Sequence, residues 1–167
     1  MSNSYLVIVE SPAKCKTIGQ IMGPNYTILA SFGHVRDVLK KNSGIIPEDN
    51  FKIQYCWVEK NQKHIQKIIS TAKQVDTIYL ATDPDREGEA IAWHIAEILK
   101  EKNIKKTTKR VVFHQITKQS IRSAFDQPRD ISMPLVDAQQ ARRALDFLVG
   151  FNLSPVLWKK IRAGLSA

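Results

Sequence analysis

Acidic side chains gather at one point of the sequence, directly after a short apolar run. Residues 78–81 have the composition of a buried strand, and Asp83, Asp85 and Glu87 follow at alternate positions. Because Pro84 disfavours a helical conformation at Asp83, we expect the strand to end there. Carboxylates this close together repel one another unless a cation or a basic group intervenes, and hard oxygen ligands on a short loop suit Mg²⁺.

The elements around this loop are those that could position a ligand site. After the loop the apolar residues fall on one helical stripe, made of Ile91, Ala92, Ile95, Ala96, Ile98 and Leu99. The carboxylates are therefore expected at the carboxyl end of a strand and just before a helix, where ligands bind in open α/β sheets. A structural interpretation stays open, because Asp-Pro-Asp favours a turn, Asp85 suits a helix N-cap, and Glu87 and Glu89 favour a first helical turn.

A second apolar run, residues 5–9, also ends in a carboxylate, Glu10. Ser11 and Pro12 are typical of a helix start, which puts Lys14 in the first helical turn. A cation is unfavourable there on dipole grounds. A lysine in this place beside a carboxylate suits phosphate binding, and a solvated lysine is the alternative.

The remaining pattern alternates strands and helices. We expect further strands at 26–30, 51–58 and 111–113. Helices are expected at 61–75, at 117–125, and from the acidic loop to about residue 102. Loops are expected at 40–50 and 105–110. This order predicts an α/β fold with a parallel sheet flanked by helices.

A boundary is expected near Gln127, which divides the chain into a domain at 1–127 and a helical region at 128–167. Helices are expected at 134–149, closed by Gly150, and from Pro155 to about 161. Arg142 and Asp146 have the i,i+4 spacing of an ion pair.

In the helical region the arginines Arg142 and Arg143 have aromatic neighbours, Phe151 and Trp158. Arginines with aromatics can hold a single nucleic-acid strand by phosphate contacts and base stacking. A helix surface with a salt bridge and two core aromatics explains the same residues.

Composition restricts the classes of protein. The chain has 167 residues, 43% hydrophobic and 25% charged, with a net charge of +9, which points to a polyanionic partner such as nucleic acid. No apolar run approaches the length of a membrane span, and the N-terminus lacks a signal-peptide pattern. Cys15 and Cys56 are too few for a disulfide framework and have no zinc-ligand spacing, so a reducing cytoplasm is expected.

Six blocks together resemble bacterial type IA DNA topoisomerases. They are LVIVESPAKCKT, FGHVRDV, ATDPDREGEAIAWH, FHQIT, AQQARRALDFLVGF and SPVLWKKIRAGLSA, in order along nearly the whole chain. The resemblance implies that residues 1–127 form a Toprim domain with a Rossmann-like sheet. It implies that residues 128–167 begin a helical domain that holds single-stranded DNA.

The resemblance implies a catalytic set of Glu10, Lys14, Asp83, Asp85, Arg86 and Glu87. Within it, Glu10, Asp83 and Asp85 match the Mg²⁺-binding carboxylates, and Lys14 matches a lysine at the scissile phosphate. Glu10 is our candidate for protonating the leaving 3′ oxygen, because acidic neighbours raise a carboxyl pKa.

The resemblance also implies DNA contacts from His34, Arg142, Arg143, Asp146, Phe151, Trp158, Ser166 and Ala167. The chain departs from the family at two positions: Phe151 stands where a tyrosine is usual, and Phe147 where a base is common. Stacking survives the first change and a hydroxyl contact does not, while the second weakens phosphate binding.

Family members cut one DNA strand with a tyrosine. The tyrosines here are Tyr5, Tyr26, Tyr55 and Tyr79, and none lies in a block that matches the family's nucleophile motif. We therefore expect a monomeric, cytoplasmic N-terminal part of an Mg²⁺-dependent, ATP-independent enzyme that relaxes negatively supercoiled DNA by single-strand cleavage, strand passage and religation. Its partners are single-stranded DNA and the remaining domains of the same polypeptide.

Two alternatives remain. Another Toprim enzyme, a primase or nuclease, shares the carboxylates but has no reason to carry AQQARR or LWKK. A non-catalytic nucleic-acid-binding module predicts DNA binding that does not depend on Asp83 and Asp85.

Overall fold

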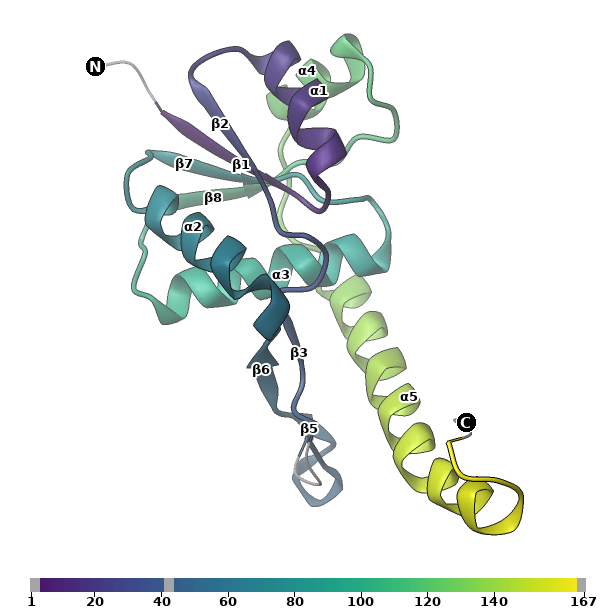
Figure 1. Ribbon diagram of the computed structural model, residues 1–167. Helices are drawn as coiled ribbons and strands as arrows, with labels where there is room; N and C mark the ends of the chain where they lie inside the picture. Colours follow the sequence, from purple (N-terminus) through teal and green to yellow (C-terminus); the bar gives the residue numbers. More distant parts are fainter. Residues whose placement is uncertain (1–3, 41–43, 165–167) are drawn as a thin grey trace.

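The structure is a computed structural model that describes residues 4–40 and 44–164, with only the backbone described at 151 and 152 (Figure 1). The elements in chain order are β1 (Tyr5–Val9), α1 (Pro12–Met22), β2 (Tyr26–Ala30), β3 (Arg36–Val38), β4 (Ile45–Ile46), a 3₁₀ turn (Pro47–Asp49), β5 (Lys52–Ile53), β6 (Tyr55–Trp57), a 3₁₀ turn (Glu59–Asn61), α2 (Gln62–Ala72), β7 (Thr77–Leu80), α3 (Arg86–Glu101), β8 (Thr107–Arg110), α4 (Lys118–Asp126) and α5 (Met133–Lys160).

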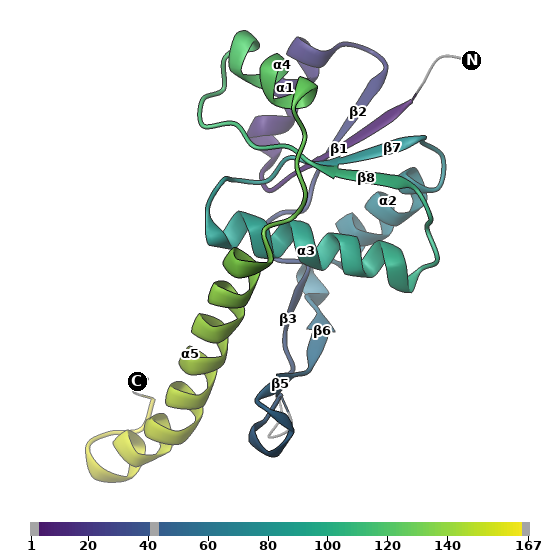
Figure 2. The same cartoon turned by 180° about the vertical axis from the view of Figure 1, so that it is seen from behind.

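The central element is a four-stranded sheet in the order β2-β1-β7-β8, and every neighbouring pair in it is parallel. Helices α1 and α4 lie on one face of this sheet, and α2 and α3 lie on the other (Figures 1 and 2). The predicted α/β fold with a parallel sheet flanked by helices is confirmed.

Strand alternation explains why both faces are covered. Leu6 and Ile8 of β1 belong to the core under α2 and α3, while Val7 and Val9 belong to the core under α1 and α4. All four are fully buried, as expected for a central strand whose successive side chains point to opposite faces. The predicted stripe of α2 is buried at Ile65, Ile68, Ile69 and Ala72.

The last strand is not where the sequence suggested. Residues 111–113 are not a strand; β8 is formed by Thr107–Arg110, inside the run expected to be a turn. Its first three residues are exposed because β8 is an edge strand, where polar and charged side chains are tolerated. Val111 and Phe113 are still buried, since they follow the strand into the core below α4.

A β-hairpin extends from the body of the molecule beside α5 (Figures 1 and 2). Strand β3 pairs antiparallel with β6, and the short β4 and β5 pair further out. The predicted loop at 40–50 therefore contains β4 and a 3₁₀ turn. The predicted strand at 51–58 is broken, because Phe51 has a left-handed backbone with φ of 55° and only the residues after it pair.

The C-terminal region is one helix, and the predicted break between two helices is wrong. Helix α5 continues through Gly150 and keeps Pro155 inside it. A glycine inside a helix costs only about 1 kcal/mol, which local context readily overrides. The first half of α5 packs on α3 and touches β3, whereas Leu145, Val149 and Leu153 are exposed.

Candidate metal and nucleic-acid site

The carboxyl ends of β1 and β7 lie side by side, with Ile8 opposite Leu80 in the register. This pairing brings Glu10 and Asp83 together, in agreement with the carboxylate set that the resemblance implied. The Asp83 N–H donates to Glu10 Oε2 at 3.2 Å. Lys14 lies between the two carboxylates: its Nζ donates to Glu10 Oε1, and to Asp83 Oδ1 at 2.5 Å.

The pKa values of these three side chains shift in different directions. Burial raises the pKa of Glu10, and its hydrogen bond to Asp83 adds to the increase. Burial also disfavours the charged form of Asp83, but hydrogen bonds with Lys14 and Glu10 outweigh it and lower the Asp83 pKa. Burial alone lowers the pKa of Lys14, yet its bonds to Asp83 and Glu10 raise it above the usual value. Lys14 therefore stays a cation, and Glu10 is the carboxyl that takes up a proton first.

Hydrogen bonds hold the acidic loop against the first turn of α3. Asp85 is the N-cap of α3, and its Oδ1 accepts from the Gly88 N–H at 2.7 Å, so the N-cap prediction is confirmed. The Thr82 hydroxyl donates to the Gly88 carbonyl at 2.5 Å. A Cβ on Gly88 would lie 2.2 Å from the Asp83 carbonyl oxygen, so the close approach requires glycine here.

These carboxylates open onto a cavity of about 290 Å³, here called the carboxylate pocket. It is lined by Glu10, Gly33, Asp83, Asp85, Glu87, Gly88 and Ile91. The donors are carboxylate oxygens, which fit Mg²⁺ in chemistry. Within the described residues, no three His, Cys, Asp or Glu side chains converge on a cation position. The fit is therefore to an Mg²⁺ that takes one or two carboxylates and keeps its waters.

His34 reaches this region from the loop after β2. Its Nε2 lies 3.2 Å from Glu87 Oε1. The loop has left-handed backbone at Phe32, with φ of 58°, and at Gly33. Buried Asn61 holds it, because its Nδ2 donates to the carbonyls of Phe32 at 3.0 Å and His34 at 2.8 Å.

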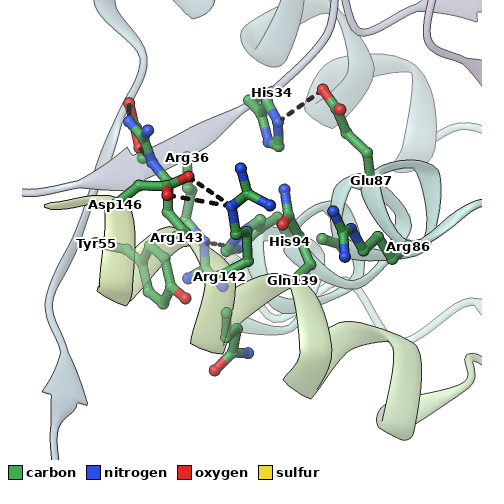
Figure 3. Close-up of a pocket in the computed structure, with 13 residues that line it drawn as sticks. His34, Arg36, Tyr55, Arg86, Glu87, His94, Gln139, Arg142, Arg143 and Asp146 are labelled. Atoms are coloured by element: carbon green, nitrogen blue, oxygen red, sulfur yellow. Dashed lines mark hydrogen bonds and ion pairs between the residues drawn. The ribbon is translucent and has the colours of Figure 1, made fainter. Parts of the chain in front are cut away.

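A second cavity, of about 380 Å³, shares Glu87 with the first, and Figure 3 shows His34 in contact with that glutamate. This arginine pocket is lined by His34, Arg36, Asp37, Tyr55, Arg86, Glu87, Ala90, His94, Gln139, Gln140, Arg142, Arg143 and Asp146. Its lining comes from the hairpin, α3 and α5. The predicted residues His34, Arg86, Arg142, Arg143 and Asp146 thus converge.

Both predicted arginines of α5 are ion-paired. The Arg142 Nε donates to both oxygens of Asp146, at 3.1 and 3.0 Å, which confirms the pair predicted from its i,i+4 spacing. Arg143 donates from Nε and Nη2 to the two oxygens of Asp37, at 2.9 and 2.8 Å. The second pair joins α5 to β3. Nearby, Phe147 Cζ would lie 3.1 Å from a Cβ on Gly44, so this apolar side chain meets the hairpin.

Arg36, Tyr55 and His94 are among the lining residues that were not predicted from the sequence, although Arg36 and His94 stand in the blocks FGHVRDV and ATDPDREGEAIAWH. The Arg36 guanidinium lies 5.3 Å from the ring centres of Tyr55 and Trp93, and its Nε donates to His94 Nδ1 at 3.1 Å. Burial and the charge of Arg36 lower the pKa of His94 to about 3, so its ring is neutral. Burial raises the pKa of Tyr55 to about 12.

The other expected DNA contacts lie away from these pockets or outside the description. Trp158 is 50% exposed near the end of α5 and lines neither pocket. The Phe151 side chain, Ser166 and Ala167 lie outside the described residues.

Comparison with known proteins agrees with this geometry. The model of the Toprim domain matches residues 5–116. The chain belongs to the Toprim family. This domain contains Glu10, Lys14 and the whole acidic loop, and it ends before α5.

The chain is similar to proteins named DNA topoisomerase 1. It is 58% identical over 165 residues to that of Xylella fastidiosa, with 98% of this chain and 20% of the relative covered. For Rickettsia bellii the identity is 54%, covering 97% of this chain and 21% of the relative. The chain thus spans about a fifth of the length of these curated relatives.

The fold is similar to that of full-length topoisomerase I from Thermotoga maritima. The TM-score is 0.86 at 44% identity, with 97% of this chain and 27% of that chain covered. The family predicted from the six blocks is confirmed. Among the described residues, no helix has the length and apolarity needed to cross a membrane.

Proposed function

We propose that this chain supplies the metal-binding and phosphate-binding part of a type IA DNA topoisomerase. The observation that carries the proposal is that the carboxylate pocket and the arginine pocket have Glu87 in common, and that His34 of the arginine pocket contacts Glu87. A DNA strand in the arginine pocket would have a phosphodiester within the reach of the carboxylate loop. Relatives named DNA topoisomerase 1 at 54–58% identity support the same reaction.

In this proposal, Asp83 and Asp85, with Glu10 beside them, would hold Mg²⁺, and the ion would supply positive charge that stabilises the phosphate. Lys14 adds a permanent cation at the same place. Glu10 holds a proton more readily than Asp83, so it can donate that proton to a leaving 3′ oxygen.

The arginine pocket supplies binding and orientation. Arg142 and Arg143 hold phosphates when the strand replaces their carboxylate partners, and His34 and Arg86 lie between this strand and the acidic loop. Holding the strand in a defined position lowers the entropy cost of reaction. Mg²⁺ as cofactor, DNA as substrate, a monomeric state and a cytoplasmic location belong to this proposal.

The nucleophile is proposed to lie outside this chain. Tyr26 and Tyr79 are partly buried against Phe125 of α4, and Tyr5 stacks on Tyr26. Tyr55 lines the arginine pocket, and burial raises its pKa to about 12. In the described part of the chain, no tyrosine lines the carboxylate pocket. Charge neutralisation and binding without a nucleophile leave DNA intact.

The test is to incubate the 167-residue chain with end-labelled single-stranded oligonucleotide and Mg²⁺. Native gels would show binding, and denaturing gels would show uncut DNA without a covalent adduct. An adduct at any of the four tyrosines would refute the proposed division of labour. Cut DNA without an adduct would favour a Toprim nuclease. Binding that the Asp83→Asn/Asp85→Asn variant leaves unchanged, with or without Mg²⁺, would favour a non-catalytic binding module.

A further inference from the structure

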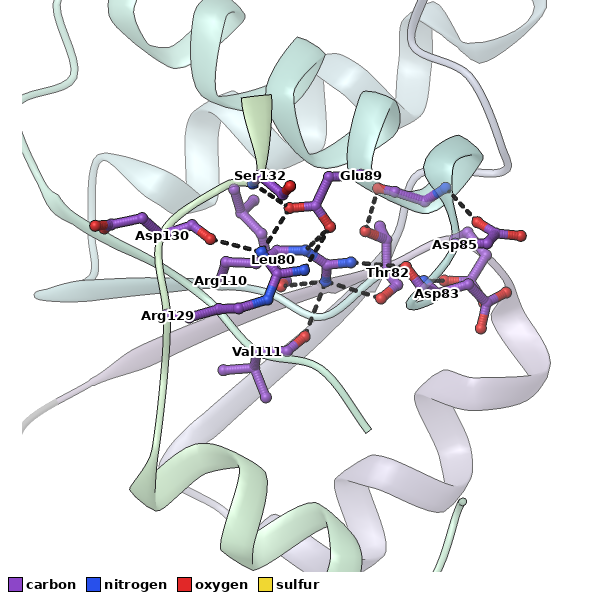
Figure 4. Close-up of polar contacts among 12 residues, drawn as sticks. Leu80, Thr82, Asp83, Asp85, Glu89, Arg110, Val111, Arg129, Asp130 and Ser132 are labelled. Carbon is purple, nitrogen blue, oxygen red and sulfur yellow. Dashed lines mark hydrogen bonds and ion pairs between the residues drawn. The ribbon is translucent and has the colours of Figure 1, made fainter. Parts of the chain in front are cut away.

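A buried ion cluster lies between the end of β8, the first turn of α3 and the segment that leads into α5 (Figure 4). It consists of Arg110, Glu89 and Arg129. The side chains of Arg110 and Glu89 are fully buried, and that of Arg129 is 38% exposed. None of the three lines the carboxylate pocket or the arginine pocket, so any effect on those pockets must pass through other groups.

Arg110 holds the backbone of the acidic loop. Its Nη1 donates to the carbonyls of Leu80, Thr82 and Val111 at 3.0, 2.8 and 2.8 Å, and its Nη2 donates to the Asp83 carbonyl at 2.7 Å. The guanidinium is a rigid planar fork, so these bonds fix the direction of the backbone as well as its distance. One buried side chain thus determines where the chain leaves β7 and presents Asp83.

Glu89 connects this fork to the start of α5. Its Oε2 accepts from Arg110 Nε at 3.1 Å and from Arg129 Nη2 at 2.8 Å. Its Oε1 accepts from Arg129 Nη1 at 2.8 Å and from the Ser132 N–H at 2.6 Å. Ser132 is the N-cap residue of α5, and its own side chain makes no capping bond.

The segment before α5 is held by its backbone as well. Arg110 and Arg129 exchange both backbone hydrogen bonds, at 3.0 and 2.8 Å, in an isolated antiparallel bridge. Burial disfavours the charged form of Glu89, but bonds from Arg129, Ser132 and Arg110 outweigh it and keep its pKa below the usual value. A buried ionic cluster contributes little stability compared with apolar packing, yet it demands one geometry.

We propose that Glu89, Arg110 and Arg129 are positioning residues that hold the acidic loop and the basic face of α5 in one fixed relation. This inference rests on the proposed function, in which the loop binds metal at one phosphate while α5 holds neighbouring phosphates. The two pockets must then keep a constant separation. The Glu89 carboxylate maintains this separation, because it accepts hydrogen bonds both from Arg110, which holds the loop, and from Ser132, the N-cap residue of α5.

The decisive variant is Arg129→Lys, because it keeps the charge but cannot make two parallel bonds to Glu89. Arg122→Lys is the matched control, since it makes the same exchange on the exposed face of α4. Spin labels on Gln66 of α2 and Leu145 of α5, in a chain with Cys15 and Cys56 replaced by serine, report the placement of α5 by pulsed electron resonance.

We expect Arg129→Lys and Glu89→Gln to broaden or shift the distance distribution between the labels, and Arg122→Lys to leave it unchanged. If Glu89→Gln does not fold, Arg129→Lys alone decides. A distribution in Arg129→Lys identical to that of the parent chain would overturn the proposal, even if its melting temperature fell. That pattern is what a purely structural role predicts.

A second measurement connects the cluster to function. At equal net charge, Arg129→Lys should raise the dissociation constant for single-stranded DNA at least about five-fold, the lower end of ordinary coupling between sites. An affinity equal to that of the Arg122→Lys control would count against positioning. If the parent chain itself bound no DNA, the proposed function would fail, while the distance measurement would still decide the positioning role.

Discussion

The carboxylate pocket and the arginine pocket share Glu87 but are built differently. In the first, Glu10 and Asp83 follow directly from paired strands, and backbone groups of the loop are bonded to Arg110, Thr82 and Asp85. Its geometry therefore comes from the main chain. Moving one carboxylate requires moving a strand end.

The arginine pocket depends on side chains that belong to separate elements. Arg143 of α5 pairs with Asp37 of β3, and both side chains are partly exposed, at 47% and 32%. Arg142 and Asp146 are more exposed still. Exposed ion pairs contribute only about 0–1 kcal/mol, so phosphates can replace these carboxylates at little cost.

This difference indicates that the carboxylate pocket is preorganised, whereas the arginines of the arginine pocket could exchange their ion-pair partners. Lys14 and the carboxylates are placed before any ligand arrives, whereas Arg142 and Arg143 carry carboxylates in the positions that phosphates would take. Changes to the backbone should therefore damage the first pocket most, and salt should affect the second most.

The largest expected effect is on metal binding. Asp83→Asn/Asp85→Asn should abolish the amide shifts that millimolar Mg²⁺ induces at residues 82–88, because it removes the carboxylates proposed as ligands. Asp126→Asn on exposed α4 is the control. Nuclear magnetic resonance titration measures the shifts, and equal shifts in both variants would disprove a metal site at the loop.

The next largest effect is expected at Gly88, which lies very close to the Asp83 backbone. Gly88→Ala should lower the free energy of unfolding by about 1–3 kcal/mol, since its Cβ would overlap the Asp83 backbone. Gly150→Ala is the control, because, within the part of the chain that the structure describes and apart from α5 itself, no atom lies within 4 Å of a Cβ placed there, and alanine favours a helix. Denaturant unfolding measures both. A Gly88→Ala variant as stable as the parent would show that this loop is not held by its backbone.

A smaller effect is expected in the arginine pocket. Replacing Arg142 and Arg143 with alanine should weaken binding of single-stranded DNA similarly for all sequences. The salt dependence should flatten by roughly 0.7 in slope for each lost phosphate contact. Lys159→Ala/Lys160→Ala removes the same charge further along α5. If both double variants had the same slope, net charge rather than the pocket would explain binding.

The effect that is smallest at neutral pH concerns His94, which is neutral in the fold because burial and Arg36 lower its pKa to about 3. The unfolded chain takes up this proton below about pH 6.5, so folding stability is lost as pH falls from there towards 3, by at most about 1.4 kcal/mol per pH unit. His94→Gln should flatten this slope, and His114→Gln on an exposed loop should not. Unfolding curves between pH 4 and 7 would show it, and parallel slopes in both variants would contradict a buried neutral His94.

Local pattern by itself determined three of the four strands of the sheet and the place of the carboxylates in the sequence. Continuous apolar runs predicted β1 and β7, an apolar stripe predicted α2, and Asp85 marked the start of α3. These features are recognisable because they depend on residues a few positions apart. Parallel strands then bring Glu10 and Asp83 to the same edge without further information.

Tertiary contacts determined the features that local pattern did not predict. The strand β8 was missed because an edge strand needs no apolar residues, and α5 continues through Gly150 and Pro155 where local signals predicted an end. The ion pair of Arg143 with Asp37 and the cluster of Glu89, Arg110 and Arg129 join residues far apart in the chain. Such partners are chosen by how the elements pack, because a charged side chain taken out of water must find its counter-charge wherever the fold places one.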